Sequence, residues 1–166
     1  MITEATAKDL EVMESQLGRP MRDVLGIAAR CACGNPLVVQ TKPRLESGEP
    51  FPTFYYLTHP WLTARLSTLE AGGLMAKLQD RLALEPELQA SYQLAHENYL
   101  SEREQLLSVE EIVGISAGGM PTRVKCLHAL AAHALAKGPG LNPIGDIALT
   151  EVGFDPQACI CKANAE

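Results

Sequence analysis

The first apolar repeat along the chain has helical spacing. Leu10, Met13 and Leu17 recur at intervals of three or four residues, and Thr6 and Asp9 stand where a capping box would begin a helix. A glycine follows the last of these leucines, and glycine is common just past a helix end. The pattern predicts a short helix near the N-terminus.

The next segments favour β-strands. Residues 37–40 and 54–58 are rich in β-branched and aromatic side chains and are bounded by proline and glycine. A further apolar stretch, 23–30, precedes them, and a turn-rich loop, 42–52, separates them. We therefore expect a small antiparallel sheet of two or three strands in the N-terminal third.

From Pro60 onward the apolar spacing is helical, and prolines stand where helices would begin. No linker or repeat divides this pattern. The expected fold class is therefore α+β, with a mostly helical remainder after the sheet, in one domain over residues 1–166 that ends in a short flexible tail from about 155. The expected helices cover 60–71, 74–84, 86 to about 106, 121 to about 137 and 142 to about 151, with a single turn at 109–113.

Composition narrows the class of protein. Hydrophobic residues make up 46% and charged residues 20% of the chain, a balance typical of globular proteins. The net charge of −6 argues against broad nucleic-acid binding, which needs a basic surface. No apolar run approaches the roughly 20 residues of a membrane span, and the acidic N-terminus does not resemble a signal peptide. We expect a cytoplasmic protein whose cysteines are reduced.

Residues 116–137 hold the densest set of chemically useful side chains. A glycine-rich loop leads to Pro121, the expected start of a helix, and two basic residues follow. Helix N-termini present unpaired N–H groups and a partial positive charge, so this turn could bind a small phosphate or carboxylate. A plain turn with exposed basic side chains is the alternative. The candidate ligand-binding residues are Ser116, Gly118, Gly119, Arg123 and Lys125, with Asn142 and Asp146 in the loop beyond the helix.

The same expected helix carries one cysteine and two histidines. In helical geometry Cys126 and His133, seven residues apart, share a face, whereas His128 lies on another. A cysteine near a helix start has a lowered pKa, so Cys126 and His128 are candidate catalytic residues for nucleophilic and proton-transfer steps. A hydrogen-bonded histidine without catalytic function is the alternative for His128.

Two C-x-C pairs indicate a possible metal site. Thiolates bind zinc and iron–sulfur clusters, and a four-cysteine site would form if the two pairs met in space. Small buried cysteines without a metal are the alternative. The candidate metal ligands are Cys31, Cys33, Cys126, His133, Cys159 and Cys161.

Several motifs identify a family resemblance. They are Cys31 with Gly34 and Pro36, residues 43–45, 50–53, 56–58, 69–70, 116–121 and 123–128, His133, and residues 138–146. Together they resemble an uncharacterised bacterial family, mainly actinobacterial, called domain of unknown function 501. The resemblance implies no settled activity. It implies that Cys33 and the Cys159/Cys161 pair are not general family features, and that His59, where related chains often carry cysteine, is a further possible ligand.

Three functions stay open on the sequence alone. The first is binding of a phosphate- or carboxylate-bearing small molecule at residues 116–137, with or without catalysis. The second is a structural or regulatory metal protein that holds zinc or an iron–sulfur cluster through Cys31, Cys126 and nearby cysteines or histidines. The third is an adaptor without chemistry of its own, which would act through a protein partner or as a homo-oligomer.

Overall fold

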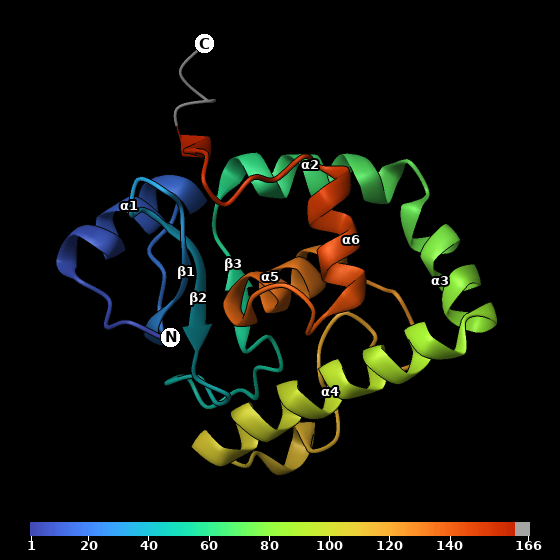
Figure 1. Ribbon diagram of the computed structural model, residues 1–166. Helices are drawn as coiled ribbons and strands as arrows, with labels where there is room; N and C mark the ends of the chain where they lie inside the picture. The colour runs from blue at the N-terminus through green and yellow to red at the C-terminus, as the bar shows by residue number, and fades with distance from the viewer. Residues whose placement is uncertain (162–166) are drawn as a thin grey trace.

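The sheet lies in the N-terminal third of the chain. The computed structural model describes residues 1–161 (Figure 1). Strands β1 (Val24–Arg30), β2 (Pro36–Thr41) and β3 (Tyr55–Leu57) pair antiparallel in the order β1-β2-β3. Ile27 pairs with Val39, so β-branched side chains lie opposite each other in the sheet. The predicted α+β class with an early antiparallel sheet is confirmed.

Helix α1 (Ala7–Leu17) begins with the predicted capping box. The Thr6 hydroxyl accepts the Asp9 N–H, and the Asp9 carboxylate accepts the Thr6 N–H. The same carboxylate pairs with Arg30 at the end of β1, which holds the helix against the sheet. The Arg30 guanidinium holds the pKa of Asp9 well below its usual range.

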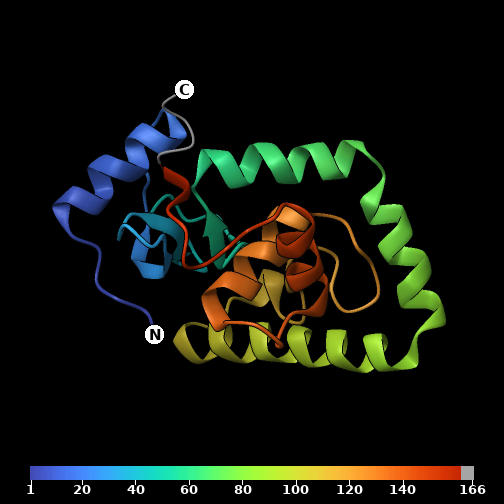
Figure 2. The same cartoon turned by 45° about the horizontal axis from the view of Figure 1, so that its top comes forward.

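Helices α2 (Pro60–Ala71), α3 (Leu74–Leu84) and α4 (Pro86–Leu106) form three sides of a frame (Figure 2). Their bounds agree with the predicted ones because prolines begin α2 and α4 and two glycines separate α2 from α3.

A single 3-10 turn, Glu110–Ile112, follows α4 where one turn of helix was expected. Arg103, in the last turns of α4, is 1% exposed and binds the backbone of the segment that follows α4. Its guanidinium donates to the carbonyl of Ile112 at 2.7 Å and to that of Ile115 at 2.5 Å. The buried charge is thus compensated by two backbone acceptors.

Helices α5 (Leu127–Lys137) and α6 (Pro143–Glu151) occupy the middle of the frame (Figure 2). Helix α5 contacts β3, α2 and α6, so it connects the sheet with the helical part of the core. A Cβ at Gly145 of α6 would lie 2.2 Å from the carbonyl oxygen of Leu130 in α5. Only glycine therefore allows these two helices to approach as they do.

The start of α5 corrects the sequence prediction, because the helix begins at Leu127 and not at Pro121. The loop before it closes on itself: the N–H of Lys125 donates to the carbonyl of Gly118 at 2.7 Å. Gly118 has a φ of +65°, which an L side chain rarely adopts. Arg123 and Lys125 consequently lie in the loop before the helix, and not in its first turn.

The C-terminal segment after α6 returns to the sheet (Figure 1). Ile160 is buried in the main hydrophobic core. The single domain and the tail from about residue 155 stay predictions, and the part of that tail at 162–166 lies outside the described residues. Within residues 1–161, no helix is both long and apolar enough to cross a membrane.

Candidate functional site

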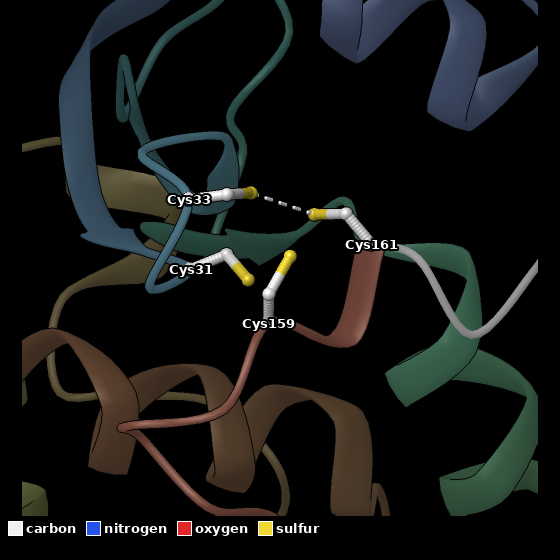
Figure 3. A group of neighbouring side chains, drawn as sticks. All are labelled: Cys31, Cys33, Cys159 and Cys161. Atoms are coloured by element: carbon white, nitrogen blue, oxygen red, sulfur yellow. Dashed lines mark hydrogen bonds between the residues drawn. The ribbon is translucent and has the colours of Figure 1, made fainter.

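Four cysteine side chains meet where the C-terminal segment reaches the turn between β1 and β2 (Figure 3). The Sγ atoms of Cys31, Cys33, Cys159 and Cys161 all lie within 4.8 Å of one another. The Cys33 thiol donates to Cys161 Sγ at a sulfur–sulfur distance of 3.4 Å. Four sulfurs in a tetrahedron around zinc, each at about 2.3 Å, would stand about 3.8 Å apart. The two C-x-C pairs therefore approach the geometry of a four-cysteine metal site.

Backbone turns aim these sulfurs toward one another. In the β1–β2 turn the N–H of Cys31 donates to the carbonyl of Asn35, and the N–H of Gly34 donates to the carbonyl of Cys31, both at 2.8 Å. Gly34 has a φ of +91°, which glycine tolerates without strain. On the other side, Ile160 is buried between its two cysteine neighbours and anchors them beside the turn.

The pKa values of Cys31 and Cys161 are shifted in opposite directions. Burial alone would raise the pKa of Cys31, but the N–H groups of Cys33 and Ile160 outweigh it and lower the pKa to about 7. Burial and the hydrogen bond with Cys33 raise the pKa of Cys161 to about 12, and the charge of Cys31 adds to this. One thiolate thus opposes the formation of the next, and a divalent cation would remove that opposition.

His59 borders the cluster. It is the N-cap residue of α2 and is 2% exposed, and its Nε2 lies 3.4 Å from Cys161 Sγ. Its Nδ1 is buried and has no hydrogen-bond partner among the described residues. Burial lowers the pKa of the ring. A neutral ring that carries its proton on Nε2 can donate to a thiolate sulfur here.

A second group of polar side chains lies where α2 ends and α5 begins. Glu70, Cys126 and His128 each offer one ligand-type atom, and these atoms lie within 4.8 Å of one another. Glu70 Oε1 accepts the N–H of Leu127 at 2.7 Å and faces His128 Nδ1 at 3.2 Å. Cys126 Sγ lies 4.0 Å from the same ring nitrogen. The structure thus brings the two predicted catalytic residues together and adds a carboxylate.

The predicted anion-binding residues take part in separate contacts. Ser116 is buried and its hydroxyl lies 2.8 Å from His96 Nδ1. Asn142 caps α6, and Asp146 accepts a backbone N–H from the loop before that helix. Gly118 and Gly119 pack closely against α5 and its preceding loop, while Arg123 and Lys125 are exposed. An anion site here stays a prediction, because these groups do not surround one space.

His133 lies in the core and is fully buried. Its Nε2 lies 3.1 Å from Asn98 Oδ1, and its Nδ1 lies 3.2 Å from Asn142 Nδ2. The ring stacks on Tyr55 and meets Tyr99 edge-on. The structure therefore separates His133 from Cys126, because Cys126 precedes α5 and does not share a helical face with it.

Sequence reasoning did not single out Glu70 as a site residue. One signal was available: Glu70 stands in the last turn of α2, where the helix dipole disfavours a negative charge. Its two hydrogen bonds to the start of α5 explain this placement, because the carboxylate there faces the positive end of α5.

Fold and cluster together define an α+β protein with a candidate four-cysteine metal centre. The chain belongs to the family described as protein of unknown function (DUF501), whose model matches residues 27–150. The resemblance drawn from the motifs is confirmed, whereas an actinobacterial origin stays a prediction. No curated protein and no solved structure matches the chain. The matched range contains Cys31, Cys33 and Cys126 and ends before Cys159 and Cys161.

Proposed function

We propose that the protein binds one zinc ion through Cys31, Cys33, Cys159 and Cys161, and that the ion fastens the C-terminal segment to the β1–β2 turn. The observation that carries this proposal is the meeting of four sulfurs from opposite ends of the chain within 4.8 Å of one another. Four thiolates without an open coordination position are typical of structural zinc. The role of the ion is therefore to stabilise the fold, in a cytoplasmic protein whose one remaining thiol, Cys126, stays reduced.

The spacing of the sulfurs supports a single ion over an iron–sulfur cluster. A cluster places several metal atoms between its cysteine ligands, which holds the sulfurs further apart than one ion does. His59 adds further support, because a ring N–H directed at a ligand sulfur is the kind of outer hydrogen bond that orients metal ligands.

The test is the metal content of the full chain, purified without chelator from zinc-supplemented cells and measured by inductively coupled plasma mass spectrometry. We expect about one zinc per chain in the wild type and less than about 0.1 in Cys33→Ser and Cys161→Ser. Cys126→Ser is the matched control, because it removes a thiol outside the cluster, and it should keep its zinc.

A second measurement links the ion to stability. A chelator should lower the Tm of the wild type and leave that of Cys161→Ser unchanged, since the metal stabilises only the state that binds it. A wild-type protein without zinc, or zinc retained in both serine variants, contradicts the proposal. Iron with acid-labile sulfide would identify an iron–sulfur cluster, and iron without sulfide would identify a single iron ion; either result contradicts zinc.

A further inference from the structure

A small cavity lies beside the Glu70–Cys126–His128 group, which the zinc proposal leaves without a role. The cavity has a volume of about 250 Å³. Its walls come mainly from β3 and the start of α5. The aromatic or aliphatic side chains of Tyr55, Tyr56, Leu57 and Ala129 lie beside Cys126 and His128, and Thr53 and Thr63 complete the lining. A thiol and an imidazole therefore face a space that suits a small apolar group.

Hydrogen-bond acceptors surround both nitrogens of His128. Nδ1 faces Glu70 Oε1 at 3.2 Å, and Nε2 faces the carbonyl of Thr63 at 3.1 Å and the hydroxyl of Ser67 at 3.2 Å. Only the imidazolium can donate from both nitrogens. The hydrogen bond with Cys126, together with the Glu70 charge and the Thr63 carbonyl, raises the pKa of His128 to about 9 although burial opposes it. The ring thus carries a positive charge at neutral pH.

Cys126 is the N-cap residue of α5. Burial alone would raise its pKa, but the hydrogen bond with His128 and the N–H of Ala129 outweigh burial, so the net shift is downward. The negative charge of Glu70, from α2, acts in the opposite direction. The other titratable groups at the cavity are Tyr55 and Tyr56, both from β3.

We propose that Cys126 is a thiolate nucleophile that accepts the acyl group of a small ester or thioester, with His128 as proton donor and Glu70 as the positioning residue. The geometry that carries this proposal is the placement of the Glu70 carboxylate, at 3.2 Å, and the Cys126 sulfur, at 4.0 Å, around the same nitrogen of His128, Nδ1, at the wall of an apolar cavity. A carboxylate that orients an imidazole beside a nucleophile is the general arrangement for covalent catalysis.

The reaction needs no partner other than water. Cys126 Sγ attacks the carbonyl carbon and a carbon–sulfur bond forms. The bond from that carbon to the leaving oxygen or sulfur breaks, and the leaving atom takes the proton of His128 Nδ1. Neutral His128 then takes a proton from water, whose oxygen attacks the same carbon. The bond to Cys126 breaks, a carboxylic acid leaves, and the thiolate and imidazolium are restored.

The first experiment measures alkylation of Cys126 by iodoacetamide between pH 5.5 and 9, resolved by peptide mass spectrometry on the zinc-loaded full chain. At pH 6.5 we expect Cys126 to react about tenfold faster in the wild type than in His128→Asn, since an ordinary thiol is mostly protonated there. His96→Asn, which removes a half-buried histidine from α4, is the matched control. If His128→Asn does not fold, the wild-type profile alone tests the proposal, because its half-point should lie below the ordinary thiol pKa of about 8.5.

The second experiment uses p-nitrophenyl acetate as the acyl donor. We expect a burst of about one p-nitrophenol per chain, an acetyl group on Cys126 in the peptide map, and no burst in Cys126→Ser. Glu70→Gln should keep the burst and move the upper limb of its pH profile to lower pH, because His128 then loses its proton more readily. A purely structural Glu70 would leave that profile unmoved.

Two results would overturn the proposal. One is alkylation of Cys126 with an ordinary thiol profile and acetylation elsewhere. The other is a second zinc per chain, with alkylation of Cys126 accelerated by a chelator, which would make Glu70, Cys126 and His128 metal ligands. The zinc proposal is tested apart from this one, because Cys33→Ser removes the zinc centre and should leave the acetylation burst intact.

Discussion

His133 should make the protein sensitive to mild acid. The two asparagines around the ring select one neutral tautomer: Nε2–H donates to Asn98 Oδ1, and Nδ1 accepts from the amide of Asn142. Protonation of Nδ1 would place a second donor against that amide inside the core. Burial lowers the pKa of His133 to about 4. The negative charge of Glu102 acts to raise this pKa, and the positive charge of Lys137 acts to lower it.

The magnitude follows from proton linkage. The folded protein prefers neutral His133, so its contribution to stability is complete above the ordinary pKa of 6.5 and is lost as the pH falls toward about 4. Integration over this shift gives a loss of about 2 kcal/mol in the free energy of unfolding between pH 7 and pH 5.

The assay compares urea unfolding of the wild type and His133→Gln at pH 7 and pH 5. Glutamine can donate to Asn98 and does not titrate, so we expect the variant to lose about 2 kcal/mol less than the wild type over this interval. The absolute stability of the variant will be lower because the ring no longer packs on Tyr55 and Tyr99.

Equal losses in the two proteins would refute the reasoning. An independent check needs no variant: the His133 ring signals in an NMR titration of the wild type should not move between pH 7 and pH 5. A midpoint near 6.5 would show that the ring takes up a proton in the folded state without cost.

Three further substitutions test the packing. Arg103→Met removes the guanidinium donor from the carbonyls of Ile112 and Ile115, of which that of Ile112 still accepts the N–H of Ile115, and should cost about 2 kcal/mol in urea unfolding; a cost below about 0.5 kcal/mol would count against the role of these hydrogen bonds. Gly145→Ala should lower the Tm strongly or prevent folding, because the new Cβ meets the backbone of α5. The control is Gly72→Ala, which should fold because the nearest atom to its Cβ is at 3.3 Å and φ is negative. Equal Tm values for the two variants would contradict the close helix approach. Thr6→Ala removes the capping box of α1 and should cost about 1 kcal/mol by the same assay, and no change would mean that this helix end does not contribute.

The parts of the fold that local chemistry determines were predictable from the sequence. The capping box at Thr6 and Asp9 and the prolines that begin α2 and α4 mark their helices without help from distant residues. The start of α5 was not predictable in this way. There Gln79 accepts the N–H of Val124 and Glu70 accepts that of Leu127, and such tertiary partners have no sequence signal near the helix.

The candidate sites likewise combine residues that the sequence marks with contacts that only the folded chain creates. The two C-x-C pairs were visible as possible ligands, but their meeting depends on a path of the chain that spacing does not reveal. The pairing of Cys126 with His128 in place of His133 follows from the later helix start, because Cys126 then precedes the helix instead of lying on its face. Glu70 could not be added until α2 and α5 had been placed against each other.

The separation of the two cysteine pairs along the chain has a consequence for the newly synthesised protein. Cys33 and Cys161 are 128 residues apart, so at a ribosomal rate of 5 to 20 residues per second the first pair is made roughly 6 to 26 s before the last ligand. During that interval only half of the proposed ligand set exists. Zinc would therefore be captured fully only after Cys161 has been made, and its retention would mark chains in which the β1–β2 turn and the segment after α6 have come together.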